Sequence, residues 1–149
     1  MLFRSVLGEA QQQAGHAAEA RTTFSRIVRS IKPTPDSQVR IDEARSLEYL
    51  ALAQAGLGDR QAALDTAAQA VEAYRDDAVT HADTEIVQAM VQAQVGEHEA
   101  AIAALPHLLQ IPAGLTLGRL HYEPLLDPIR DDPRVQKLLA DASLAQGRP

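Results

Sequence analysis

The first candidates for chemistry are histidines that lie close to acidic residues along the chain. His81 and Glu85 are four residues apart, so a helix would place both side chains on one face, as in a two-ligand metal site. The sequence offers no third ligand nearby, and an exposed polar face explains the pair. His98 stands between Glu97 and Glu99, where it could serve acid–base chemistry, but acids also suit the positive end of a helix. We therefore predict neither a metal site nor catalytic residues here.

Paired carboxylates are the second candidate for chemistry. Asp76-Asp77 and Asp131-Asp132 each precede a predicted helix, where a carboxylate can cap free backbone N–H groups. His107, next to Pro106 on an apolar helix, is predicted to be a packed or rim residue. The chain has no cysteine, nucleophile elbow, phosphate-binding glycine loop or His-Glu-x-x-His motif. The sequence therefore predicts no catalytic residue, no cofactor and no enzyme activity.

Composition and charge narrow the class of protein. Aromatic residues make up only 3% of the 149-residue chain and alanine, leucine and glutamine dominate, which favours an all-α fold closing on small side chains. A net charge of −6 argues against a nucleic-acid partner, because such surfaces are usually basic. The uncharged stretch 100–118 is interrupted by Pro106, Pro112 and Gly114, so we predict no membrane span. No signal peptide is evident, and a cytoplasmic location is expected.

Three glycines reveal an internal similarity. Gly15, Gly58 and Gly96 are spaced by 43 and 38 residues, and each is followed five residues later by an alanine. Apolar or small residues recur nine, twelve and thirteen positions after each glycine, which is a helical stripe. These positions are Phe24, Ile27 and Val28; Ala67, Ala70 and Val71; and Leu105, Leu108 and Leu109. The repeated unit is predicted to be a helix, a glycine turn and a second helix.

These units resemble the tetratricopeptide repeat. The first unit is similar to the family pattern at Gly8, Gly15, Ala20 and Phe24, and the resemblance covers about residues 7–111. The later units have Ala51 and Ala89 in place of the first glycine, and their periods exceed the family's usual length of about 34 residues. The resemblance implies a right-handed stack of about three helix hairpins.

The tail has a second resemblance. Residues 122–135 read Tyr-Glu-Pro-Leu-Leu-Asp-Pro-Ile-Arg-Asp-Asp-Pro-Arg-Val, which is similar to the closing segment of many bacterial tetratricopeptide regions. Leu126 and Val135 stand where that segment usually has Trp and Phe. The resemblance implies the C-terminal part of a bacterial signalling protein that carries a serine/threonine kinase, a nucleotide cyclase or a winged-helix module.

Proline and capping residues predict the element boundaries. The predicted helices cover about 2–13, 17–30, 37–55, 60–74, 78–94, 97–109 and 133–145, with Thr116 capping a further short helical turn. Asp36, Asp76 or Asp77, and Asp132 are the other expected caps. We divide the chain into repeats over 1–112 and a proline-punctuated capping segment over 113–149, in which Val135, Leu138 and Leu139 form the apolar face of a capping helix.

The expected function is that of a protein–protein interaction scaffold. Stacked hairpins expose the first helix of each pair along a groove that can hold a peptide or a helix of a partner protein. The resemblance places the following residues in that groove: Glu9, Gln13, Arg45, Glu48, Leu52, Asp83, Met90 and Gln94. Leu52 and Met90 could instead belong to the hairpin core. The alternative is a regulatory or sensory C-terminal segment of a truncated bacterial kinase or cyclase.

Overall fold

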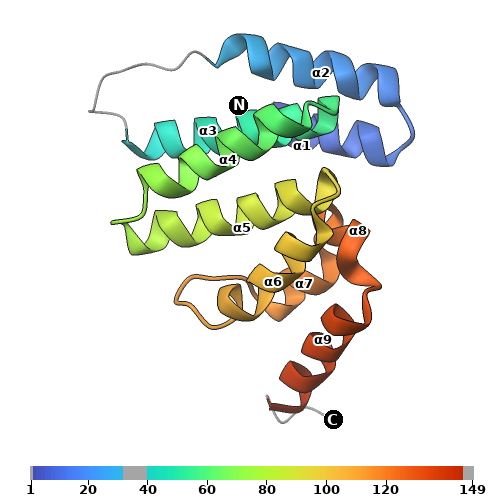
Figure 1. The fold of residues 1–149 in the computed structure, drawn as a ribbon. Coiled ribbons are helices and arrows are strands. Elements are labelled where there is room, and N and C mark those ends of the chain that lie inside the picture. Colours follow the sequence, from blue (N-terminus) through green and yellow to red (C-terminus); the bar gives the residue numbers. More distant parts are fainter. Residues whose placement is uncertain (1, 32–39, 146–149) are drawn as a thin grey trace.

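The chain folds into successive helices that follow one another along the molecule, from α2 (Ala17–Ser30) at one end to α9 (Pro133–Ala145) at the other (Figure 1). The computed structural model describes residues 2–31 and 40–145, and it contains no strand within them, so the all-α expectation is confirmed. The first six helices form three neighbouring pairs: α1 (Leu2–Gln13) with α2 (Ala17–Ser30), α3 (Arg40–Leu57) with α4 (Arg60–Ala73), and α5 (Ala78–Gln94) with α6 (His98–Leu108).

The same glycine turn joins the two helices of each pair. Gly15, Gly58 and Gly96 have φ angles of 79°, 83° and 87°, in the left-handed region where a Cβ is unfavourable. After each glycine, the next backbone N–H donates to the carbonyl five residues before it, at 2.8, 2.9 and 2.8 Å. This is the hydrogen bond that closes a Schellman motif. The three turns predicted from the sequence are therefore confirmed at the level of backbone geometry.

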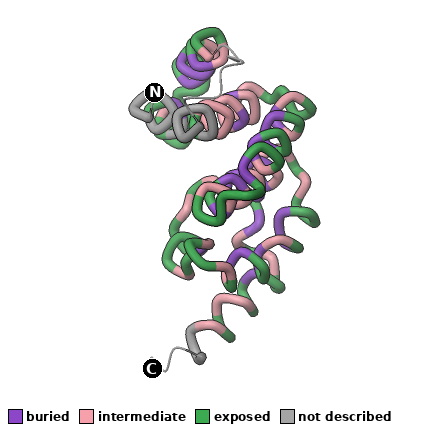
Figure 2. Tube along the Cα trace, turned by 90° about the vertical axis from the view of Figure 1, so that its left-hand side faces the viewer, coloured by how far each residue is buried: buried purple, intermediate pink, exposed green. Residues whose placement is uncertain are grey.

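Burial repeats in step with the turns. The residues five, nine and twelve positions after each glycine are all buried, and none is more than 2% exposed: Ala20, Phe24 and Ile27; Ala63, Ala67 and Ala70; Ala101, Leu105 and Leu108. Those thirteen positions after each glycine are only partly buried. The buried residues lie along the helix faces that point toward neighbouring helices (Figure 2). The alanines bring helices close together, because they carry no atom beyond Cβ.

A single aromatic ring joins the first pair to α3. Phe24 of α2 is 1% exposed, and its ring lies against Gly8 of α1 and Gly56 of α3. A Cβ at either glycine would overlap the ring. The two glycines thus provide the space that the phenylalanine fills.

Three predicted caps are confirmed. The Asp77 carboxylate accepts hydrogen bonds from the N–H groups of Val79 and Thr80 at 3.2 and 3.0 Å, at the start of α5. The Thr116 hydroxyl accepts from the Arg119 N–H at 3.1 Å and begins α7 (Leu117–Tyr122). Asp132 accepts from the Arg134 N–H at 2.8 Å at the start of α9 (Pro133–Ala145). Asp36 and the predicted start of the third helix at 37 lie outside the described residues; that helix ends at Leu57, two residues beyond the predicted end.

The tail shares one core with the third helix pair. Besides α7 and α9, it contains a 3₁₀ turn, η1 (Pro124–Leu126), and the short helix α8 (Asp127–Arg130). Its buried side chains pack with those of α5 and α6, and none is more than 4% exposed: Leu115, Leu120, Leu126, Ile129 and Val135. Of the predicted face of α9, Val135 is fully buried, whereas Leu138 and Leu139 are only partly buried. Most of the buried tail residues therefore come from the turns before α9.

Candidate functional site

The predicted groove residues lie on the first helix of each pair, namely α1, α3 and α5. Met90 is 1% exposed and belongs to the core. Leu52 is partly buried and packs against two core clusters. Met90 therefore takes the core alternative, whereas Leu52 contacts the core and remains partly exposed. The Glu9 side chain lies outside the described residues.

Charged side chains of α3 and α5 interact with one another and with a charge from the tail. The pKa of Glu48 on α3 is raised to about 7, chiefly by burial and then by the negative charge of Asp83 on α5, while the positive charges of Arg45 and Arg119 oppose the rise. Three of these four residues were predicted for the groove, and Arg119 comes from α7. The structure therefore brings charges from α3, α5 and the tail into one electrostatic environment.

Gln13 and Gln94 share a cavity of about 230 Å³ at one end of the same helices. Gln12, Pro124, Leu125, Asp127 and Pro128 complete its lining. The Gln94 Nε2 atom donates a hydrogen bond to the backbone oxygen of Leu125 at 2.9 Å, which fixes the tail against α5. Two predicted groove residues from distant pairs thus lie in one cavity, whose other wall is the tail.

The tail side of this cavity and Arg119 were not predicted from the sequence. The tail was predicted only to cap the stack, because its prolines indicate short turns and give no information on which helix those turns contact. The one available signal was the spacing of four residues between Pro124 and Pro128 on either side of Leu125. Such spacing predicts a turn but not its partner.

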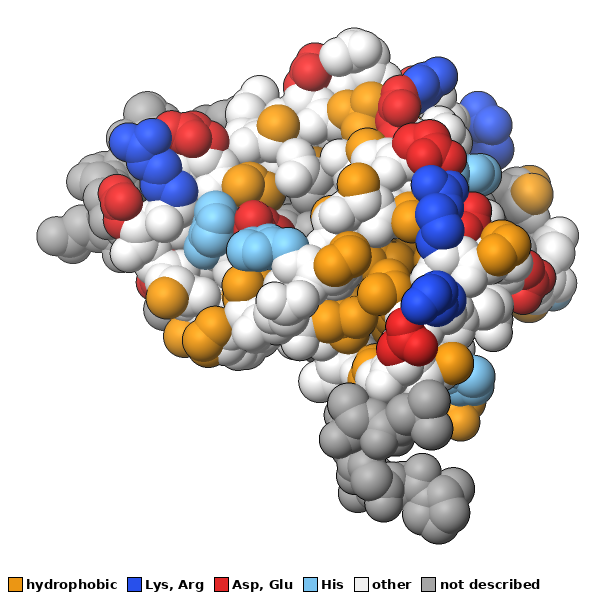
Figure 3. Space-filling model, turned by 60° about the horizontal axis from the view of Figure 1, so that its bottom comes forward, with side chains coloured by type: hydrophobic (Ala, Val, Ile, Leu, Met, Phe, Trp, Pro, Cys, Tyr) orange, Lys and Arg blue, Asp and Glu red, His pale blue; other side chains and the backbone are white. Residues whose placement is uncertain are grey.

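His81 and Glu85, which were predicted to share an exposed polar face of α5, are only 27% and 23% exposed, and His107 of α6 joins them. His81 Nε2 lies 3.6 Å from one Glu85 oxygen, and His107 Nε2 lies 3.5 Å from the other. On the face shown in Figure 3, two histidine side chains lie together against an acidic one. Across residues 2–31 and 40–145, no three metal-ligating side chains are grouped so that they could hold an ion. The cluster is a polar contact between α5 and α6.

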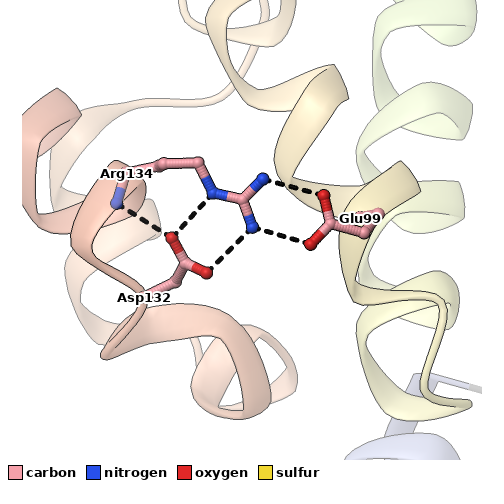
Figure 4. Close-up of polar contacts among 3 residues, drawn as sticks. All are labelled: Glu99, Asp132 and Arg134. Carbon is pink, nitrogen blue, oxygen red and sulfur yellow. Dashed lines mark hydrogen bonds and ion pairs between the residues drawn. The ribbon is translucent and has the colours of Figure 1, made fainter.

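The remaining acidic candidates have structural partners. Glu97 pairs with Arg60, which connects the start of α6 to α4. The Arg134 guanidinium binds both Glu99 oxygens at 2.8 Å, and it also donates to the two Asp132 oxygens at 3.0 and 2.9 Å (Figure 4). These hydrogen bonds hold the pKa of Asp132 at about 2, well below its ordinary value. The arginine joins the start of α9 to α6 at the surface.

A second cavity, of about 420 Å³, lies between α9 and the segment that follows α6. Its lining consists of Leu109, Ile111, Ala113, Gly114, Leu115, Thr116, Leu117 and Ala142. None of these side chains is ionisable. This cavity offers shape and apolar area but no group that could orient a ligand electrostatically.

The fold and these sites define an all-helical protein with a mixed polar and apolar cavity at one end of its first helices. Comparison of the chain with models of protein families, with curated proteins and with solved structures finds no match. Among the helices that the structure describes, none combines the length and the apolar character that crossing a membrane requires.

Proposed function

We propose that this chain is a protein–protein interaction scaffold, built as a tetratricopeptide-like stack, that holds a peptide or helix of a partner protein along α1, α3 and α5. The repeated glycine turns and the buried alanines that follow them support a common hairpin design. In such a design the first helices of successive pairs line one surface. That surface is where the partner segment would lie.

The observation that carries this proposal is the convergence of side chains from separate pairs. Gln13 of the first pair and Gln94 of the third pair line one cavity, and Arg45 and Asp83 both act on the charge of Glu48. A recognition surface needs such convergence, because specificity comes from several groups acting on one ligand. The net charge of −6 favours a protein partner over a nucleic acid.

The proposal assigns no catalytic role to the acidic pairs. Asp77 caps α5, and Asp132 and Glu99 bind Arg134. Capping and ion pairing account for these carboxylates as structural groups.

Peptide display on the immobilised chain tests the proposal. Peptides selected for binding should lose affinity for Gln13→Ala and for Glu48→Gln, which change the surface at two separate points. Gln69→Ala is the matched control, because Gln69 is exposed on α4, the second helix of its pair. If selected peptides bind all three variants as tightly as they bind the unchanged chain, the groove is not the binding surface.

A further inference from the structure

The cavity of about 230 Å³ is built from three parts of the chain that are far apart in sequence. Gln12 and Gln13 end α1, Gln94 ends α5, and the remaining lining belongs to η1 and α8. The hydrogen bond from Gln94 to the Leu125 carbonyl positions the tail wall. The cavity therefore exists only when the first pair, the third pair and the tail are all in place.

The lining favours a neutral occupant. Its only ionisable side chain is Asp127, and that carboxylate is paired with Arg130. The other polar groups are carboxamides, which are uncharged. An ammonium or carboxylate entering the cavity would lose water without gaining a free counter-ion, and this is unfavourable.

The walls divide into an apolar part and a hydrogen-bonding part. Pro124, Leu125 and Pro128 present rings and an aliphatic chain, and proline has no backbone N–H to offer. Gln12, Gln13 and Gln94 present amide donors and acceptors. A side chain that is apolar over its body and has one polar group at its edge matches this division.

The volume of the cavity is sufficient for an aromatic ring. A dry apolar cavity of about 150 Å³ is large enough to bind benzene, and this cavity has about 230 Å³. Tyrosine and tryptophan combine a ring with one O–H or N–H group, and they contribute strongly at interfaces for this reason.

We propose that this cavity receives one tyrosine or tryptophan side chain of the partner, with its ring against Pro124, Leu125 and Pro128 and its O–H or N–H bonded to a glutamine carboxamide. This inference rests on the proposed function, because the partner segment in the groove presents the ring. It makes the tail part of the recognition surface as well as part of the core.

The test uses the whole chain and four small probes: the N-acetyl amides of tyrosine, tryptophan, phenylalanine and lysine. Binding is followed by two-dimensional ¹H–¹⁵N NMR, which resolves glutamine side-chain amides. The chain contains no tryptophan, so indole fluorescence reports the tryptophan probe alone. Tyrosine and tryptophan should shift the amides of Gln12, Gln13 and Gln94. Phenylalanine should bind about 2- to 10-fold more weakly, because it lacks the hydrogen bond, and lysine should bind least.

A double variant, Gln12→Leu with Gln13→Leu, separates the hydrogen bond from the ring contact. It should reduce the preference for tyrosine over phenylalanine, because Gln94 is then the only carboxamide left in the lining, whereas the matched variant Gln69→Leu should keep the full preference. The inference is overturned if no probe shifts the lining residues at its solubility limit, or if all four probes bind equally.

The two proposals fail in different ways. Groove-dependent peptides that carry no aromatic residue would remove the cavity inference and leave the scaffold function in place. If aromatic probes bind the cavity but no selected peptide depends on the groove, the cavity remains an aromatic-binding site and the scaffold function is wrong.

Discussion

Leu126→Ala should destabilise the protein strongly, although this residue lies in a 3₁₀ turn and not in a long helix. Leu126 is 1% exposed and packs in the core that η1 shares with α5 and α6. Truncating a buried leucine to alanine removes the transfer free energy and leaves a cavity, and it typically costs about 2–5 kcal/mol. In a chain of this length, that cost lowers Tm by about 4 to 20 °C.

Leu138→Ala is the matched control, because Leu138 packs against the same core but is only partly buried. Its expected cost is about 0.8–1.5 kcal/mol, half of the value for a fully buried side chain. Urea titration followed by circular dichroism at 222 nm gives both free energies of unfolding. If Leu126→Ala costs no more than Leu138→Ala, the turns do not contribute to the core as the structure indicates.

Removal of the whole tail should destabilise the protein more than any single substitution in it. Truncation after Pro112 deletes five buried side chains, Leu115, Leu120, Leu126, Ile129 and Val135. At about 1.5–3 kcal/mol each, their loss is about 7–15 kcal/mol before chain entropy is considered. That loss is comparable to the whole stability of a typical domain, about 5–15 kcal/mol. The truncated chain should therefore expose the apolar faces of α5 and α6 and aggregate, and a monomeric product with unchanged Tm would contradict this.

Three further predictions concern single residues. Because the raised pKa of Glu48 means that the folded chain binds more protons than the unfolded chain, stability falls as pH rises from about 4.5 to 7. Glu48→Gln should therefore raise Tm more at pH 8 than at pH 5, and equal gains would argue against a buried carboxylate. Gly58→Ala should lower the free energy of unfolding, measured by thermal melts, by about 1–2 kcal/mol, because φ at this position is 83°. Gly118→Ala within α7 should raise it by about 0.5–1 kcal/mol, because the added methyl group meets open space. Effects of the same sign would contradict the turn geometry. Arg134→Gln should raise the pKa of Asp132 from about 2 toward 3.8, so the stability that the ionised carboxylate contributes should be lost at a higher pH than in the unchanged chain. A ¹³C NMR titration measures this pKa. An unchanged pKa would exclude the arginine as the cause of the shift.

The helices of the three pairs were predictable because their signals are local. A glycine that ends a helix and an alanine five residues later act within one turn, and Gly15, Gly58 and Gly96 show the same geometry. Caps such as Asp77 and Thr116 act within three residues. Such short-range rules can be read from the chain before any packing is known.

The candidate site was predictable only in part, because it depends on contacts between distant segments. Gln13 and Gln94 were predicted from the resemblance, yet their shared cavity depends on where the tail crosses α5. His107 could not be placed beside Glu85 without knowing how α5 and α6 pack. The burial of Met90 decided between two alternatives that its apolar side chain left open.

The ring of Phe24 between Gly8 and Gly56 has a consequence for how this sequence can vary. Neither glycine can gain a methyl group while the phenylalanine remains, and loss of the ring alone would leave a void between α1 and α3. A smaller residue at position 24 together with alanine at positions 8 and 56 would fill the same space. Related chains should therefore change these three positions together, so that a small residue at position 24 accompanies larger ones at positions 8 and 56.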